Sequence, residues 1–285
     1  MCRLFGMSSA PARVRATFWL LDASDSLAAQ SRREPDGTGL GTFTVDGDPR
    51  VEKQPLAAYA DAAFATEARE RHSATFVAHI RYASTGGLTD VNTHPFTQRG
   101  RIFAHNGVIQ DLPKLDAELG PYRSLVRGDT DSERLFALIT KHADACGDVT
   151  AGIATALRWV AAELPVLAAN LVLTTADELW AVRYPDTHDL FVLQRAGDVG
   201  RHLEHASAAG TVRVRSGDLS DAPAVVIASE RMDENPDWQP LAPGELLHVA
   251  ADLTVTREVV VDHPPARPLT LADLDATAAA SQSGR

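Results

Sequence analysis

The chain has 285 residues, of which 45% are apolar and 23% charged, as is usual for a globular protein. Its formal net charge is −11, and a diffusely acidic protein is a poor binder of DNA, RNA or anionic membranes. The two cysteines are too few for a disulfide framework and lack the CxxC spacing of a zinc site, so we expect a reducing, cytoplasmic compartment. The sequence shows neither a signal peptide nor an apolar run of about 18 residues, so it predicts no export and no membrane span.

Strands and helices are predicted to alternate along the first half of the chain. Strands are expected at 2–8, after a Gly-rich turn within 36–45, at 75–83, and at 101–109, the last broken by an Asn-Gly turn. Helices are expected in pieces within 14–31 and at 56–71, 113–120, 130–143 and 150–164. In the fourth of these, Thr130 is expected as the N-cap, with Glu133 three residues later.

The second half of the chain reads as successive strands joined by short turns: ANLVLTTAD, ELWAVRY, DLFVLQRA, APAVVIASE and GELLHVA. Blocks of strands and helices that end in a strand-rich half predict an α+β layered fold around one large core. We therefore expect one domain over residues 2–262. A Pro/Ala/Ser-rich tail follows at 263–285, and we expect its last ~15 residues to be frayed or disordered.

The first cysteine stands at position 2, and the next is Cys146. A lone cysteine is usually a packing residue, which is one interpretation of Cys2. In the other interpretation, aminopeptidase removal of Met1 leaves a chain that begins with Cys2. That residue then carries a thiol nucleophile beside its own α-amine, which is a base.

An arginine at a predicted strand end marks the stretch AHIRYASTGG (78–87). Arg81 is placed there to hold a carboxylate through two parallel N–H bonds, and Ser84 is able to add a hydroxyl contact. A structural salt bridge is the alternative role for Arg81. The charged, Gly-rich loop SRREPDGTGLG (31–41) is a candidate lid, and its glycine spacing is not that of a nucleotide-binding loop.

Two further polar clusters follow along the chain. Asn-Gly in AHNGVI is most often a turn, but the Asn106 amide and the Gly107 backbone N–H are also suited to form an oxyanion hole. In GDTDSER, two acids stand at a helix start. We interpret Asp129 as a helix cap, and Asp131 as either a cap or a ligand for an ammonium group.

A thiol, an oxyanion hole, an arginine and a carboxylate together suit the binding and cleavage of a γ-glutamyl amide. The sequence resembles the class II glutamine amidotransferases, whose glutaminase domain is an N-terminal nucleophile hydrolase. The resemblance covers residues 2 to about 260 and rests on motifs in the order of the family: MCRLFG, REPDGTGLG, HIRYASTGG followed by NTHPF, AHNGVI and TDSE.

The resemblance implies a four-layer αββα sandwich, with two antiparallel sheets between helical layers. It implies that Cys2 is the nucleophile and that Asn106 and Gly107 form the oxyanion hole. It also implies these substrate-binding residues: Arg81 for the carboxylate, Asp131 for the ammonium group, Ser84 for a hydroxyl contact, and Arg33 in a glutamine-covering loop. The loop departs from the family here, since this chain has Arg-Glu-Pro-Asp where many members have Arg-Gly-x-Asp. His79, His94 and His105 are interpreted as structural.

The expected function is that of an amidohydrolase that cleaves the side-chain amide of glutamine or a γ-glutamyl compound through a Cys2 thioester. It releases glutamate and ammonia or an amine, and it requires no metal or organic cofactor. Two enzyme roles stay open: a glutaminase subunit that supplies ammonia to a synthase partner protein, and a γ-glutamyl amide hydrolase of an ergothioneine-type pathway. A third hypothesis is an inactive binding or regulatory homologue. The sequence does not determine the oligomeric state.

Overall fold

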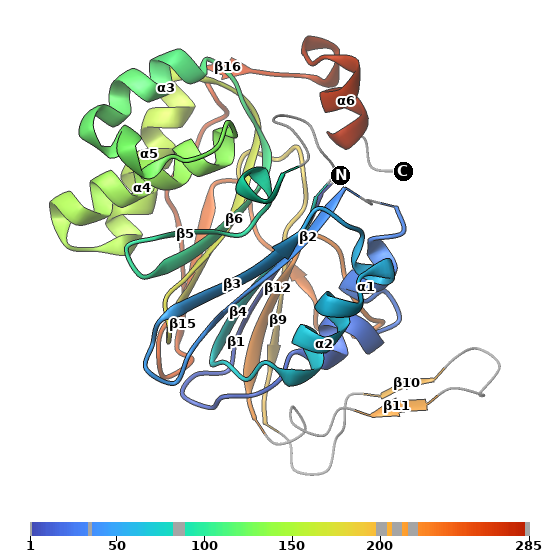
Figure 1. Cartoon of the computed structure of the whole chain (residues 1–285). Coiled ribbons are helices and arrows are strands. Elements are labelled where there is room, and N and C mark those ends of the chain that lie inside the picture. Colours follow the sequence, from blue (N-terminus) through green and yellow to red (C-terminus); the bar gives the residue numbers. More distant parts are fainter. Residues whose placement is uncertain are drawn as a thin grey trace.

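Two sheets packed face to face form the centre of the computed structural model (Figure 1), which describes residues 2–33, 36–81, 89–197, 204–206, 213–215 and 222–282. The first sheet contains, in spatial order, β13 (Gln239–Pro240), β9 (Phe191–Arg195), β12 (Ala224–Ala228), β1 (Arg3–Ser8), β4 (Thr75–Arg81), β2 (Gly37–Phe43) and β3 (Pro49–Gln54). The second contains β15 (Val255–Val259), β14 (Glu245–Val249), β8 (Leu179–Val182), β7 (Pro165–Thr174), β6 (Arg101–Ile109) and β5 (Phe96–Gln98).

Both sheets are antiparallel along these orders, and the short β16 (Arg267–Pro268) adds a parallel pairing to β7. A separate hairpin consists of β10 (Glu204–Ala206) and β11 (Arg213–Arg215).

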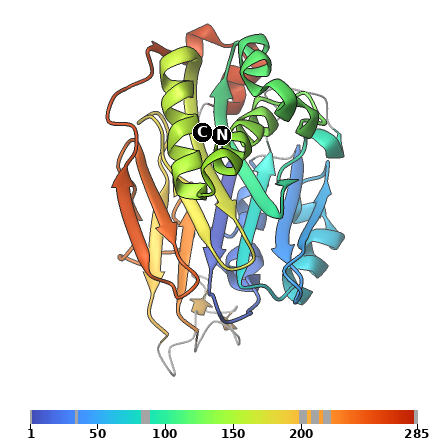
Figure 2. The same ribbon diagram turned by 90° about the vertical axis from the view of Figure 1, so that its left-hand side faces the viewer.

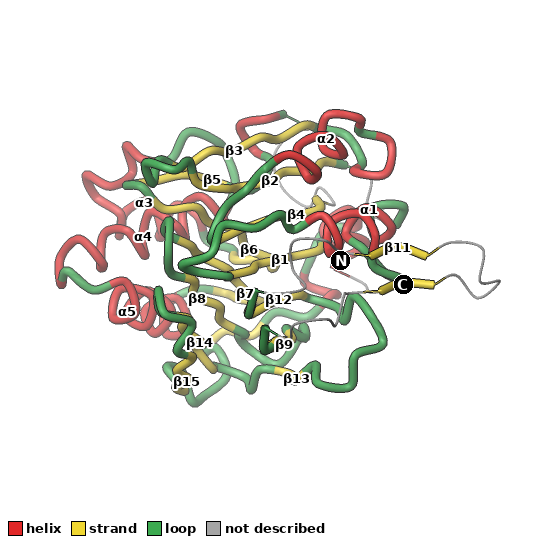
Figure 3. The backbone as a smooth tube through the Cα atoms, turned by 90° about the horizontal axis from the view of Figure 1, so that it is seen from below, coloured by secondary structure: helices red, strands yellow, loops and turns green. Residues whose placement is uncertain are grey.

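Helices cover the outer face of each sheet, as Figures 1 and 2 show. The first sheet is covered by a π-helical turn at Phe18–Asp22, α1 (Leu27–Gln30), a 3-10 turn at Ala58–Ala60 and α2 (Ala62–Glu70). The second is covered by α3 (Leu112–Leu119), a 3-10 turn at Gly120–Leu125, α4 (Asp131–Cys146) and α5 (Val149–Glu163). Further helical turns lie at Asp90–Asn92 and Leu271–Asp273, and α6 (Ala276–Gln282) ends the described chain. Figure 3 shows the strands lying between the two helical groups, so the predicted αββα sandwich is confirmed.

Alternating side chains of the strands build the cores between these layers. On β1, Leu4 belongs to the core between the two sheets, whereas Phe5 and Met7 belong to the core under α1 and α2. Successive residues of a strand point to opposite faces, and both faces of this strand are covered. This explains why residues 4–7 are all apolar or glycine instead of alternating with polar residues.

The Asn-Gly turn predicted inside 101–109 is wrong, because β6 continues through it. Asn106 pairs with Asn170 and Gly107 with Ala169 of β7. A Cβ at Gly107 would lie 1.9 Å from the Ala168 carbonyl oxygen, so glycine permits a close approach of two strands here. The glycines of 36–41 likewise lie mainly within β2 instead of in a turn before it.

The predicted N-cap of α4 is confirmed, because the Thr130 side chain accepts from the Glu133 N–H. The Glu133 carboxylate does not complete a capping box and accepts instead from the Gly128 N–H at 2.7 Å. The interpretation of Asp129 as the cap is wrong, because it lies one residue before Thr130.

The expected fraying of the last ~15 residues is wrong for most of 271–282, where a 3-10 turn at Leu271–Asp273 and α6 are formed. β16 joins the second sheet, and α6 buries Ala278, Ser281 and Gln282. The Gln282 side chain lies 2.9 Å from Nε2 of the buried His188. The small side chains of this Ala-rich helix let it pack closely against the protein, although an Ala/Ser-rich composition by itself favours disorder. Among the helices that the structure describes, none is long and apolar enough to cross a membrane.

Candidate active site

A small cavity opens where β1 and β4 of one sheet meet β6 and the start of α4 from the other. Its lining residues are Cys2, His79, Arg81, Asn92, His94, His105, Gly107, Thr130, Asp131 and Ser132. The fold thus brings together four of the residues proposed from sequence, Cys2, Arg81, Gly107 and Asp131, although they are up to 129 positions apart. Asn106 lies beside them and contacts Cys2 directly.

Cys2 is buried, with 7% of its surface exposed, and immediately precedes β1. The antiparallel register pairs Arg3 with Ile80, which places Cys2 next to Arg81 at the end of β4. Arg81 is 4% exposed. Burial lowers its pKa, while the neighbouring Cys2 and Asp36 act in the opposite direction. An arginine remains charged under such shifts, so the thiol faces a buried cation.

The Asn106 side chain holds the backbone of Cys2. Its Nδ2 donates to the Cys2 carbonyl oxygen at 2.8 Å, and the residue is 1% exposed. A carboxamide nitrogen has two N–H groups, so one remains for a second acceptor beside Cys2. The next residue, Gly107, lines the cavity with its backbone.

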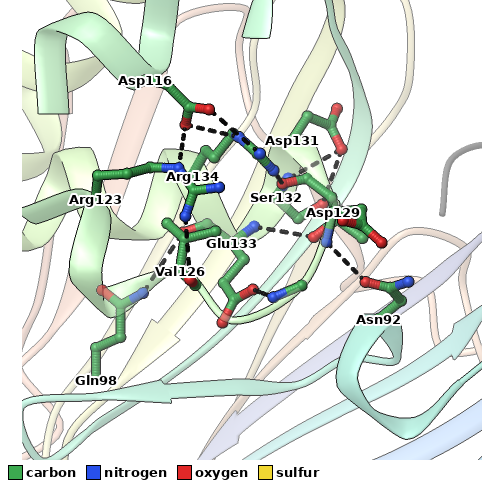
Figure 4. A network of polar contacts seen from close by, with 12 residues as sticks. Asn92, Gln98, Asp116, Arg123, Val126, Asp129, Asp131, Ser132, Glu133 and Arg134 are labelled. Atoms are coloured by element: carbon green, nitrogen blue, oxygen red, sulfur yellow. Dashed lines mark hydrogen bonds and ion pairs between the residues drawn. The ribbon is translucent and has the colours of Figure 1, made fainter. Parts of the chain in front are cut away.

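Asp131 is the first residue of α4 and joins this helix to β6. Its Oδ2 accepts from the Ile109 N–H at 2.8 Å, and its Oδ1 accepts from the Ser132 N–H at 2.9 Å. A carboxylate is stabilised at a helix N-terminus and has about four acceptor sites, so it is able to bind a further cationic donor. Figure 4 shows Asp131 at one end of the polar network around the start of α4.

The loop before α4 is held in place from the opposite side of the cavity. Asn92 Oδ1 accepts from the Asp129 N–H at 2.9 Å (Figure 4). A Cβ at Gly128 would lie 2.4 Å from the same oxygen, so only glycine allows this close packing. The segment that carries Asn92 therefore helps to place Asp131.

Arg33 does not reach the cavity. It is 42% exposed, and its guanidinium lies 3.1 Å from Glu230 and 3.3 Å from Asp25. Glu230 also lies 2.8 Å from the buried Arg3, the residue after Cys2. Arg33 is thus connected to the start of β1 through a shared carboxylate. Ser84, the remaining predicted substrate contact, lies outside the described residues.

Sequence reasoning assigned no binding role to several residues that line the cavity. Asn92 lies in the NTHPF stretch, and Thr130 and Ser132 flank Asp131 in TDSE, so the motifs contained the signal. His79, His94 and His105 were interpreted as structural, yet all three face the same cavity. Within the part of the chain that the structure describes, no group of three His, Cys, Asp or Glu side chains has the arrangement of a metal site.

A family model described as glutamine amidotransferases class-II matches residues 1–268. The chain belongs to this family. It is similar to the probable glutamine amidotransferase DUG3 of Saccharomyces cerevisiae, with 31% identity over 136 residues, 43% of this chain and 38% of that protein. It is also similar to the putative glutamine amidotransferase YafJ of Escherichia coli, with 28% identity over 86% of this chain and 96% of that protein. The chain therefore spans well under half of DUG3 and nearly all of YafJ.

Solved structures share the fold. The glutamine phosphoribosylpyrophosphate amidotransferase from B. subtilis superposes with a TM-score of 0.64 at 19% identity, over 92% of this chain and 50% of that one. A protein from Pseudomonas aeruginosa described as a predicted glutamine amidotransferase superposes with a TM-score of 0.59 at 21% identity, over 90% of this chain and 100% of that one. At these identities the likeness establishes the architecture alone.

Proposed function

We propose that this protein hydrolyses the side-chain amide of glutamine or of a γ-glutamyl compound through a thioester on Cys2. One observation carries the proposal: Cys2, Arg81, Gly107 and Asp131 line a single cavity. A buried cation and a buried anion around one thiol match a zwitterionic amino acid. Arg81 suits the α-carboxylate, because a guanidinium binds a carboxylate through two parallel hydrogen bonds. Asp131 suits the α-ammonium group.

The proposed reaction begins with removal of Met1, which gives Cys2 a free α-amine with a reference pKa near 8. The neutral amine takes the thiol proton, directly or through a water molecule. The thiolate attacks the amide carbonyl, and the oxyanion is stabilised by the Asn106 side chain and the Gly107 N–H. Collapse breaks the C–N bond, and the ammonium group protonates the departing ammonia or amine. Water then cleaves the thioester and releases glutamate.

The ammonia has two proposed fates, release or transfer to a synthase partner protein. The synthase partner is proposed because the chain belongs to the amidotransferase family, and the residues of the cavity do not bear on it. We also propose a cytoplasmic location, since Cys2 and Cys146 are both free thiols and a reducing compartment preserves them.

The proposal is tested by intact mass spectrometry before and after incubation with diazo-oxo-norleucine, an electrophilic mimic of glutamine. We expect a starting mass without Met1 and a single adduct. The adduct is absent in Cys2→Ala and present in Cys146→Ala, which controls for the other thiol. An adduct that survives in Cys2→Ala, or retention of Met1 in an active enzyme, contradicts the proposal.

The leaving group is identified by comparing glutamine with γ-glutamyl amides as substrates. If the enzyme forms the diazo-oxo-norleucine adduct but turns over only γ-glutamyl amides larger than glutamine, it is a γ-glutamyl amide hydrolase. Turnover of glutamine with release of ammonia indicates a glutaminase.

A further inference from the structure

Two histidines lie ring against ring, with their planes tilted by 34°, and are buried beside the proposed nucleophile. The ring centroids of His79 and His94 are 4.2 Å apart, and the two side chains are only 1% and 6% exposed. None of their four ring nitrogens makes a hydrogen bond of normal geometry with any residue that the structure describes. The pair packs edge-on against Phe96 through His94, at 4.7 Å. Two polar rings are thus held tightly by packing, and among the described residues their nitrogens have only the nearby His105 backbone, which approaches His79 without the geometry of a normal hydrogen bond.

The position of the pair follows from the strand geometry. His79 lies two residues before Arg81 on β4, on the same face of the sheet, and therefore about 6.6 Å deeper between the sheets. Gly39 lies opposite His79 in the register of β2 and β4. A Cβ at Gly39 would lie 2.1 Å from the His94 carbonyl oxygen, so this glycine makes room for the backbone of the residue that carries the second ring. The pair forms a polar lining below the expected carboxylate site.

Two more polar atoms, one lining the cavity and one beside it, lack a hydrogen bond of normal geometry with the residues that the structure describes. Asn106 Oδ1 is buried and makes no hydrogen bond within the described residues. His105 Nδ1 lies 2.9 Å from Ser132 Oγ, and His105 Nε2 has only the backbone of Ala168 nearby, without the geometry of a normal hydrogen bond. A buried polar group without a partner costs about 1–3 kcal/mol, and native proteins usually satisfy such groups with ordered water. The cavity offers about 20 Å³ to the centre of a water molecule, which is enough for one. The chemistry of the lining therefore calls for a polar partner, and the size of the cavity allows a water molecule to be that partner.

We propose that the imidazoles of His79 and His94 hold the water molecule that hydrolyses the Cys2 thioester. This inference rests on the proposed function and adds a positioning role that the family resemblance did not supply. Both rings act on the water and not on the sulfur, so they are positioning residues.

The protonation states suit this role. Burial lowers the pKa of His79 to about 3 and holds the pKa of His94 well below its usual range, with Arg81 acting in the same direction on both. At neutral pH each ring is therefore uncharged, with one N–H donor and one nitrogen acceptor. A neutral pair orients a water through both kinds of hydrogen bond and brings no second cation into the site.

The reaction step balances without a further reagent. The water oxygen forms a bond to the thioester carbon, and the C–S bond breaks. The α-amine of Cys2 takes a proton from the attacking water and returns one to the sulfur. The products are a free thiol and glutamate, and the histidines gain and lose nothing.

The experiment uses the processed full chain with L-glutamine as substrate, and compares wild type with His79→Phe and His94→Phe. Phenylalanine keeps an aromatic ring in the packed position and removes the nitrogens. Rapid quenching and intact mass give the rate at which the acyl-enzyme forms, and steady-state glutamate release gives its hydrolysis. We expect acylation within a few fold of wild type, hydrolysis slowed by on the order of 10- to 100-fold, and an accumulated acyl-enzyme. Added hydroxylamine bypasses the slow step and gives γ-glutamyl hydroxamate.

Two controls separate positioning from folding. His248→Phe alters another stacked histidine, whose ring lies 4.7 Å from that of Trp180 outside the cavity, and we expect unchanged kinetics. His79→Gln restores a donor and an acceptor and is expected to recover part of the hydrolysis. Acylation and hydrolysis that fall together in the phenylalanine variants would show a purely structural role and overturn the proposal. Unchanged hydrolysis in both variants would also overturn it.

A high-resolution crystal structure tests the water itself. We expect an ordered water within hydrogen-bond distance of both rings in wild type and its loss in His79→Phe. A dry cavity overturns the inference while leaving Cys2 chemistry intact. Failure of the proposed function is a different result, namely no diazo-oxo-norleucine adduct on Cys2.

Discussion

Replacement of Asn106 by alanine separates the two roles that the structure gives this side chain. Its Nδ2 donates to the Cys2 carbonyl oxygen at 2.8 Å, and the same amide is proposed to bind the oxyanion. The variant removes both interactions from a residue that is 1% exposed. It therefore affects stability through one contact and catalysis through the other.

The two magnitudes follow from the contacts. Loss of the hydrogen bond leaves one buried carbonyl oxygen without its partner, which costs about 1–3 kcal/mol of unfolding free energy. Loss of an oxyanion donor lowers kcat by on the order of 10²–10³, or about 2.7–4 kcal/mol of transition-state stabilisation. KM is expected to change little, because the oxyanion exists only in the transition state and the intermediate.

Asn170 provides a matched control on the neighbouring strand. It pairs with Asn106 in the ladder of β6 and β7 and is also 1% exposed. Its amide donates to the carbonyl oxygens of His188 and Asp189 and accepts from the Tyr184 N–H at 2.9 Å. Asn170→Ala therefore leaves more buried groups without partners, and we expect it to lose more stability than Asn106→Ala. Its kcat is expected to stay within a few fold of wild type.

The assay measures glutamate release and denaturant unfolding for both variants, at a temperature where both are folded. Intact mass confirms that Met1 is removed in each. The oxyanion assignment is refuted if Asn106→Ala keeps kcat within about tenfold of wild type. It is also refuted if the two variants lose activity in parallel with their stability, because then the losses arise from the fold.

Three further predictions concern the groups around the site. The pKa of His79 is about 3 in the folded chain and about 6.5 in the unfolded chain. As the pH falls from about 6.5 toward 3, only the unfolded chain therefore binds a proton at this residue, so the wild-type protein loses stability. His79→Phe should reduce this slope by up to about 1.4 kcal/mol per pH unit, and equal slopes in pH-dependent denaturation would contradict the assignment. In Gly39→Ala the new Cβ would collide with the His94 carbonyl oxygen, so we expect the free energy of unfolding to fall by about 1–3 kcal/mol and kcat to fall as well. An unchanged melting temperature would contradict this prediction, because it would show that the backbone at His94 shifts without cost. Thr130→Ala removes the cap that accepts from the Glu133 N–H and should cost about 1 kcal/mol in thermal unfolding, which Thr130→Ser should largely retain.

Local sequence patterns predicted most elements of the fold. The helix at α4 was recognised with its cap, because Thr130 and the acidic first turn act within a few residues of each other. The later strands were recognised from their apolar runs. The predictions that failed depended on distant partners. Asn106-Gly107 is a turn signal by itself, but the close approach of Ala168 from β7 makes it part of a continuous strand.

The sequence by itself determined the candidates for the site, since Cys2, Arg81, Gly107 and Asp131 stand in recognisable motifs whose chemistry follows from residue type. Only the tertiary structure decided which of them share a cavity, because strand register and sheet packing bring them together from distant parts of the chain. It also left Arg33 outside the cavity, bound to Glu230. The contact between the buried rings of His79 and His94 could not be predicted from sequence for the same reason. Burial and the lack of a partner are properties of a packed environment, and no single stretch of sequence contains them.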